Sequence, residues 1–166
     1  MGESSVERLI MNQADYLYVS GHGHHVNGQV EGIGPEQVRD WWNRDLDCVV
    51  FSVCSILDIG NYNDVVYPGD TTPSRASPGK LWEQVGPSVL LGYDAIAPRD
   101  GGGAPARILA SWKLLRVSMG DVDAWMQANS LNRAWNACAI VKDVNYVYFK
   151  TKWMRHKVIK VTKASW

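Results

Sequence analysis

Runs of hydrophobic residues alternate with polar segments along the chain, and three of the runs have the composition of β-strands. They are DYLYVS at 15–20, LDCVVFSVCS at 46–55 and PSVLLGYDAI at 87–96. The second run is apolar at almost every position, which is typical of a strand buried on both faces, as in a parallel sheet. Each run stops at a glycine or at a polar cluster, where a strand is expected to end.

Other segments have the periodicity of helices or belong to the C-terminal part of the sheet. We expect helices at 35–45, 81–86, 106–119 and 121–140. The segments 144–150 and 157–163 predict a C-terminal β-hairpin. Strands that alternate with helices indicate an α/β fold with a mostly parallel sheet flanked by helices.

Length and composition restrict the class of protein. The chain has 166 residues and is most simply one domain spanning 1–166. Its formal net charge is zero, which favours neither nucleic acid nor an anionic membrane as a partner. No apolar stretch is long enough to span a bilayer and no secretory signal opens the chain. Three cysteines, an odd number, are typical of free thiols in a reducing compartment. We therefore expect a cytoplasmic protein, unless trimming removed a signal for secretion.

Chemically distinctive residues lie at the ends of the three predicted strands. His22 follows the first strand between two glycines, Cys54 ends the second, and Asp94 lies near the end of the third. The carboxyl ends of parallel strands meet at one edge of a sheet, where open α/β sheets bind ligands. A histidine beside a thiol can serve nucleophilic catalysis. We therefore expect His22 and Cys54 to face one cleft, whereas Cys48, at the start of the same strand, and Cys138, in a predicted helix, are expected to be structural.

Two of these blocks resemble a known family. YLYVSGHG at 16–23 and CVVFSVCS at 48–55 resemble the signature blocks of the caspase-like (clan CD) cysteine peptidases. In that family a hydrophobic strand ending in His-Gly is followed by a helix and by a hydrophobic strand ending in Cys. PSVLLGYDAIAP at 87–98 is similar to a strand of the separase- and CHAT-type members, and the pattern also resembles gingipain and clostripain. The resemblance implies a caspase-like fold that hydrolyses a protein or peptide substrate without a cofactor.

Carried over to this sequence, the resemblance assigns roles to three residues of the dyad region. Cys54 would be the nucleophile and His22 would transfer protons. The backbone amides of Gly23 and Cys54 would form the oxyanion hole. The segments 57–80 and 99–105 are expected to border the substrate groove.

The resemblance also implies a binding pocket for the residue before the scissile bond. Asp94, with Tyr93 beside it, occupies the place where an acid can line this pocket in the separase and CHAT-type relatives. A carboxylate there would select Arg or Lys, because carboxylates pair well with guanidinium groups. Asp58, shortly after the candidate nucleophile, is the competing acid.

One departure from the family pattern motivates an alternative function. The family fold has about two strands and a helix before the histidine strand, whereas only about fifteen residues precede that strand here. We expect the sheet to be incomplete at its N-terminal side, or completed by another chain or an N-terminal segment. The alternative is therefore a catalytically inactive binding or scaffold module with the same fold.

The turn GHGHH at 21–25 leaves a zinc-dependent hydrolase as a second alternative. It resembles the start of the HxHxDH motif of metallo-β-lactamases but lacks the aspartate. His156 is the one histidine elsewhere, and no other ligands have a recognisable spacing. We therefore expect no metal site, and we expect His24 and His25 to lie at the rim of the cleft.

Overall fold

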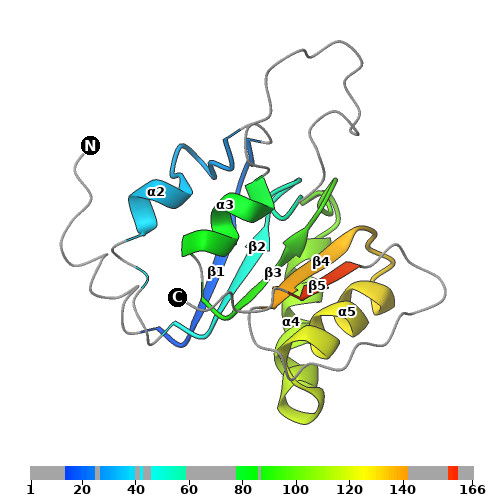
Figure 1. The fold of residues 1–166 in the computed structure, drawn as a ribbon. Coiled ribbons are helices and arrows are strands. Elements are labelled where there is room, and N and C mark those ends of the chain that lie inside the picture. The colour runs from blue at the N-terminus through cyan, green and yellow to red at the C-terminus, as the bar shows by residue number, and fades with distance from the viewer. Residues whose placement is uncertain are drawn as a thin grey trace.

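The chain folds as an α/β structure, shown in Figure 1. The computed structural model describes residues 14–24, 27–39, 42, 46–58, 78–85, 87–141 and 157–160. The strands are β1 (Tyr16–Ser20), β2 (Cys48–Ser52), β3 (Val89–Tyr93), β4 (Ala137–Val141) and β5 (Lys157–Lys160). The helices are α2 (Pro35–Val38), α3 (Pro78–Val85), α4 (Ala104–Met119) and α5 (Asp121–Leu131).

The described strands form one five-stranded sheet in the order β1-β2-β3-β4-β5. β1, β2 and β3 run parallel, β4 is antiparallel to β3, and β5 is parallel to β4. The register pairs Tyr16 with Cys48 and Ser20 with Ser52, so β1 and β2 begin and end together. The residues that follow these two strands therefore emerge side by side at the carboxyl edge of the sheet.

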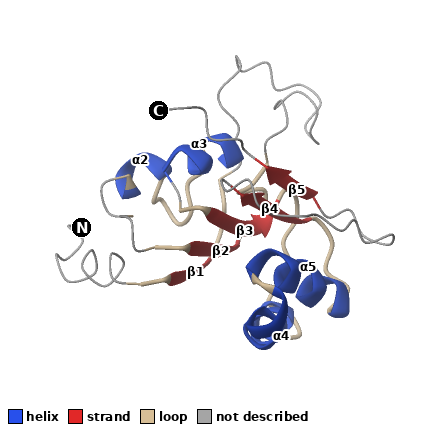
Figure 2. Cartoon of the chain, turned by 60° about the horizontal axis from the view of Figure 1, so that its bottom comes forward, coloured by secondary structure: helices blue, strands red, loops and turns tan. Residues whose placement is uncertain are grey.

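Helices cover both faces of the sheet. Figure 2 shows α2 and α3 on one side and α4 and α5 on the other. All five residues of β2 are buried. Val49 and Phe51 pack in the core on the side of α2 and α3, whereas Cys48 and Val50 pack in the core on the side of α4 and α5. This confirms the prediction of a strand buried on both faces.

One predicted helix is wrong over its last part. The helix expected at 121–140 ends at Leu131, and the apolar run ACAIV forms β4, between β3 and β5 in the sheet. Arg133 and Asn136 have positive φ angles of 54° and 63°, so the chain turns between the two elements. A short apolar run fits a buried strand as well as a helix, and pairing on both sides of the run decides for the strand. Cys138 therefore lies in a strand, although it is buried as expected.

Other predictions fall partly outside the described residues. The helix expected at 35–45 is described as α2, and most of its remaining part lies outside. The segments 1–13 and 59–77 also lie outside the described residues. So does 144–150, and the C-terminal hairpin therefore stays a prediction. β5 itself pairs in parallel with β4, with Cys138 opposite Lys157 and Val141 opposite Lys160.

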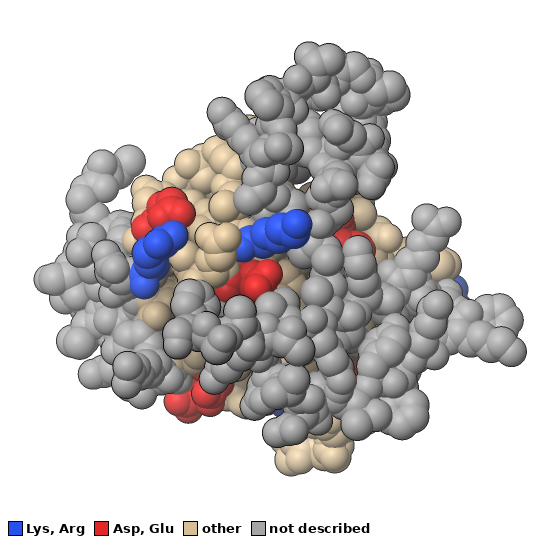
Figure 3. All heavy atoms as spheres, in the orientation of Figure 1, with Lys and Arg blue, Asp and Glu red and all other residues tan. Residues whose placement is uncertain are grey.

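Charges of both signs are mixed on the surface that the structure describes. On the face drawn in Figure 3, acidic and basic side chains lie close to one another. Arg39 and Glu36 form an ion pair, with 3.1 Å between Arg39 Nη2 and Glu36 Oε1. None of the described helices combines the length and the apolar character that crossing a membrane requires.

Candidate active site

The loop that carries His22 leaves the sheet directly after β1 and is held by a bridge within the loop and by a hydrogen bond from α3. Gly23 and Val30 form an isolated β-bridge within the loop. The indole of Trp82 in α3 donates a hydrogen bond of 2.7 Å to the carbonyl of Gly28. His22 is exposed at the surface, but the backbone around it is fixed to the rest of the molecule.

Glu31 holds the main chain of His22 on both of its polar groups. The N–H of His22 donates to Glu31 Oε1 at 2.5 Å, and the N–H of Glu31 donates to the carbonyl of His22 at 3.1 Å. The Glu31 side chain lies over Gly21, where a Cβ would stand 2.7 Å from Glu31 Cγ and Oε1. Glycine at position 21 therefore makes this contact possible. Glu31 itself has a φ of 48°, which is uncommon for a residue with a side chain.

Cys54 lies in a tight turn that follows β2. The strand ends at Ser52, so Cys54 is exposed beyond the strand and not within it. The backbone N–H of Ala97 donates to its sulfur at 3.3 Å. Ser55 has a φ of 53°, and its N–H donates to the carbonyl of Ala95 at 2.7 Å. The segment after β3 therefore contacts both the backbone of the turn, through Ala95, and the thiol, through Ala97.

Gly23 brings the histidine loop against the cysteine turn. A Cβ at this position would lie 2.5 Å from Val53 Cγ1 and 2.6 Å from the carbonyl oxygen of Cys54. Any other residue would force the two segments apart. In its bridge with Val30, the hydrogen bonds run between the neighbours on either side. The N–H of Gly23 therefore points away from Val30.

A cavity of about 470 Å³ opens at this edge of the sheet, and both His22 and Cys54 line it. Its volume is within the range of small-molecule and substrate sites. The other lining residues come from the ends of β1 and β2 and from the segment after β3: Ser20, Gly21, Ser52, Ile96, Ala97, Pro98, Arg99 and Asp100. The structure thus brings the predicted pair to one cavity.

The three residues predicted for the substrate pocket are not among those that line this cavity. The phenol of Tyr93 is buried in the core, where it donates to Asn129 Oδ1 at 2.8 Å, and burial raises its pKa. Asp94 follows β3, and its N–H donates to the carbonyl of Asn136 at 3.1 Å. Asp58 is half-buried at the end of the cysteine turn.

Two charged residues of the cavity were not identified from the sequence pattern. Arg99 and Asp100 lie after β3, at the start of the glycine-rich segment, and both are exposed. The segment 99–105 was expected to border the groove, and its first two residues do line the cavity. The signal for Asp100 was weak, because a single acid beside three glycines is typical of any surface turn.

The remaining histidines give no metal cluster among the described residues. His24 is exposed, and its N–H donates to the carbonyl of Gln29 at 2.8 Å. His25 and His156 lie outside the described residues. Within the described ranges, no group of three or more His, Cys, Asp or Glu side chains is placed to hold a metal ion.

Comparisons with known proteins do not assign the chain to a family. No protein-family model matches the sequence, and neither curated proteins nor solved structures give a significant match. What the structure establishes is an α/β fold with a mostly parallel sheet and a cavity that contains His22 and Cys54. The likeness to caspase-like peptidases remains a prediction from the sequence.

Proposed function

We propose that this chain is a cysteine endopeptidase with a caspase-like fold, in which Cys54 and His22 form the catalytic dyad. The observation that supports it is their position: both line one cavity at the carboxyl edge of two neighbouring parallel strands. None of the three cysteines forms a disulfide, as expected for a thiol enzyme in a reducing compartment such as the cytoplasm. The substrate is a protein or peptide, and neither a nucleic acid nor a cofactor takes part.

Cys54, His22 and one water molecule account for every bond that hydrolysis forms and breaks. The sulfur of Cys54 attacks the scissile carbonyl carbon while His22 takes the thiol proton. The tetrahedral intermediate then expels the amine, which receives that proton from His22, and a thioester remains on Cys54. Water, deprotonated by His22, attacks the thioester, and the released thiolate regains a proton from His22.

The oxyanion of each tetrahedral intermediate would be bound by the amides of Gly23 and Cys54. The N–H of Gly23 points away from its bridge partner Val30, and Gly23 packs directly on Cys54. Two fixed donors beside the reacting carbon stabilise the negative charge as it develops. The Ala97 N–H donates to the sulfur of Cys54 and helps to fix its position.

The proposed preference for Arg or Lys before the scissile bond has a new candidate acid. Asp94 was favoured by the sequence, but Asp100 is the acid that lines the cavity. A carboxylate at this position can pair with a guanidinium or ammonium group of the substrate. Arg99 lines the same cavity, so the position of its guanidinium affects how strong this preference is.

The alternative of an inactive binding module is favoured by one feature of the sheet. Within the described residues, β1 pairs with β2 alone and stands at the edge of the sheet. An exposed edge strand can accept a further strand from an N-terminal segment or from another chain. In that case the fold would serve assembly, and Cys54 would be an ordinary surface thiol.

The proposal is tested by comparing how wild type, Cys54→Ala, His22→Ala and His24→Ala hydrolyse Arg- and Lys-containing peptides. We expect Cys54→Ala to abolish cleavage and His22→Ala to lower kcat/KM at least about a hundredfold, the usual contribution of general acid–base catalysis. His24→Ala is the matched control, because His24 is exposed on the same loop and does not line the cavity. Equal cleavage by wild type, Cys54→Ala and His22→Ala would refute the dyad. Asp100→Asn and Asp94→Asn, assayed in the same way, show which acid sets the preference.

A further inference from the structure

A second cavity shares a wall with the cavity of Cys54. It also has a volume of about 470 Å³, and the segment 96–99 lines both. Its other side is formed by the start of α4 and by the turn between α5 and β4: Ala104, Asn132, Arg133, Ala134, Trp135 and Asn136. A single segment of backbone therefore separates this space from the candidate nucleophile.

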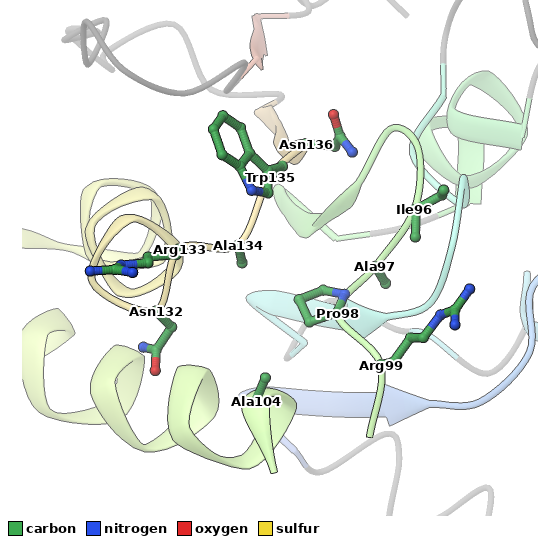
Figure 4. A pocket seen from close by; sticks show the side chains of 10 residues that line it. All are labelled: Ile96, Ala97, Pro98, Arg99, Ala104, Asn132, Arg133, Ala134, Trp135 and Asn136. Carbon is green, nitrogen blue, oxygen red and sulfur yellow. The ribbon is translucent and has the colours of Figure 1, made fainter. Parts of the chain in front are cut away.

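Small and apolar side chains form the inside of this second cavity. Figure 4 shows Ala104 and Ala134 pointing toward one another across the space, with the ring of Pro98 beside them. Trp135 stands at one side, whereas Arg99 and Arg133 extend away from the space. Three of these positions carry no side chain larger than proline, so the protein leaves room for a bulky group supplied from outside.

Two large apolar side chains remain exposed at this cavity. Ile96 is 68% exposed and Trp135 is 57% exposed. A single exposed apolar residue is common and needs no explanation. Here two of them flank one hollow, which is more typical of a binding surface. Tryptophan in particular offers a rigid, large contact area to a partner.

The turn that presents Trp135 is held in an unusual conformation. Arg133 and Asn136, on either side of it, have positive φ angles. The N–H of Ala134 donates to the carbonyl of Asn129 at 2.9 Å, and the carbonyl of Asn136 accepts from Asp94. Strained residues that the surrounding structure holds in place are more frequent at ligand sites. The backbone that carries Trp135 is therefore held on both sides.

We propose that this second cavity binds a bulky apolar side chain of the same polypeptide that Cys54 cleaves. The inference rests on the proposed function. The second cavity adjoins the cavity of Cys54, so a polypeptide bound at Cys54 is the molecule that can reach it. An extended segment is about 5 Å wide and an extended substrate advances about 3.3 Å per residue. A substrate that crosses Ala97 and Pro98 thus places a residue two or three positions from the scissile bond in the second cavity. The substrates are polypeptides with a Leu, Phe or Trp side chain at that distance.

The test uses internally quenched peptides that contain one Lys or Arg in an alanine background, with Gly, Leu, Phe or Trp at one further position. We expect wild type to prefer an apolar residue two or three positions from the cleaved bond over Gly, by about tenfold in kcat/KM, the effect of burying one large side chain. Trp135→Ala, and Ala104→Leu, which fills the cavity, should each remove this preference. Leu131→Ala is the matched control, because Leu131 is exposed on α5 and lines neither cavity.

An unchanged preference in Trp135→Ala and Ala104→Leu would overturn the inference while leaving the dyad intact. If wild type cleaves no peptide, the proposed function fails, and binding decides the inference separately. Calorimetric titration of Cys54→Ala with the Trp-containing and Gly-containing peptides provides this measurement. Tighter binding of the Trp peptide that is lost in Cys54→Ala/Trp135→Ala supports the site, whereas equal binding of both peptides overturns it.

Discussion

At the scale of single residues, His22 is positioned by contacts of its main chain and not of its imidazole. Glu31 binds both polar groups of the His22 main chain, and Gly21 leaves space for the Glu31 side chain. Gly23 then packs on the carbonyl of Cys54. Because the ring is exposed, these backbone contacts, and not contacts of the ring, fix the place of His22 at the cavity. Glu31 acts through His22 and is thus a positioning residue of the proposed site.

Replacement of Glu31 should lower catalysis without weakening substrate binding. We expect Glu31→Ala to reduce kcat about tenfold with little change in KM, because the loss of a charge-assisted hydrogen bond lets the His22 loop shift. Glu31→Gln keeps an acceptor oxygen for the His22 N–H and should recover most of the activity. Steady-state kinetics of the two variants measures this. A rise in KM at unchanged kcat, or equal losses in both variants, would contradict the positioning role.

At the scale of elements, Asn129 fastens the end of α5 to β3 through its side-chain amide and to the turn into β4 through its main-chain carbonyl. Asn129 Oδ1 accepts from the Tyr93 hydroxyl at 2.8 Å, and its Nδ2 donates to the carbonyl of Trp125 at 2.9 Å. Its own carbonyl accepts from the N–H of Ala134 at 2.9 Å. Asn129 is fully buried, so none of these groups has water as a substitute partner. The connection positions the turn that carries Trp135.

Truncation of this amide should destabilise the fold. We expect Asn129→Ala to lower the free energy of unfolding by about 2–3 kcal/mol, because it leaves the buried Tyr93 hydroxyl without its partner. Tyr93→Phe combined with Asn129→Ala should cost less than the sum of the two single changes. Urea denaturation of the three variants measures this. If Asn129→Ala lowers the free energy of unfolding by less than about 0.5 kcal/mol, the side-chain amide does not hold α5 to β3.

At the scale of the whole molecule, the layered fold gives the three cysteines different surroundings. Cys48 starts β2 at the edge opposite the cavity and is buried, and burial raises the pKa of its thiol well above its usual range. Cys138 is buried in β4, where its thiol contacts the carbonyl of Leu57 at 3.8 Å. Cys54 alone among the three is exposed.

Iodoacetamide at neutral pH should therefore alkylate the native protein at Cys54 and the urea-unfolded protein at all three cysteines. The reason is that Cys48 and Cys138 are both buried and inaccessible, and the raised pKa of Cys48 also keeps its thiol protonated. Peptide mass mapping after timed labelling measures the rates. Faster labelling of Cys54 in wild type than in His22→Ala would favour the dyad over an inactive module. Labelling of Cys48 or Cys138 at the rate of Cys54 in the native protein would contradict the environments described above.

The first three strands and the candidate dyad could be predicted from the sequence because they depend on local patterns. A run of apolar residues at consecutive positions, such as 46–55, needs burial on both faces wherever it lies in the chain. The residues that follow parallel strands must meet at one edge, which brought His22 and Cys54 to one cavity. The caspase-like fold and the peptidase activity are still predictions.

What only the tertiary structure decided depends on contacts between segments far apart in the sequence. The segment 137–141 became a strand because β3 and β5 pair with it, whereas its composition fits a helix as well. Glu31, Asp100 and Trp135 gained their places from the path of loops, whose conformations depend on packing and not on residue periodicity. Periodicity records which side of an element meets the core. It does not indicate which loops meet one another, and in this protein loops supply most of the residues that line both cavities.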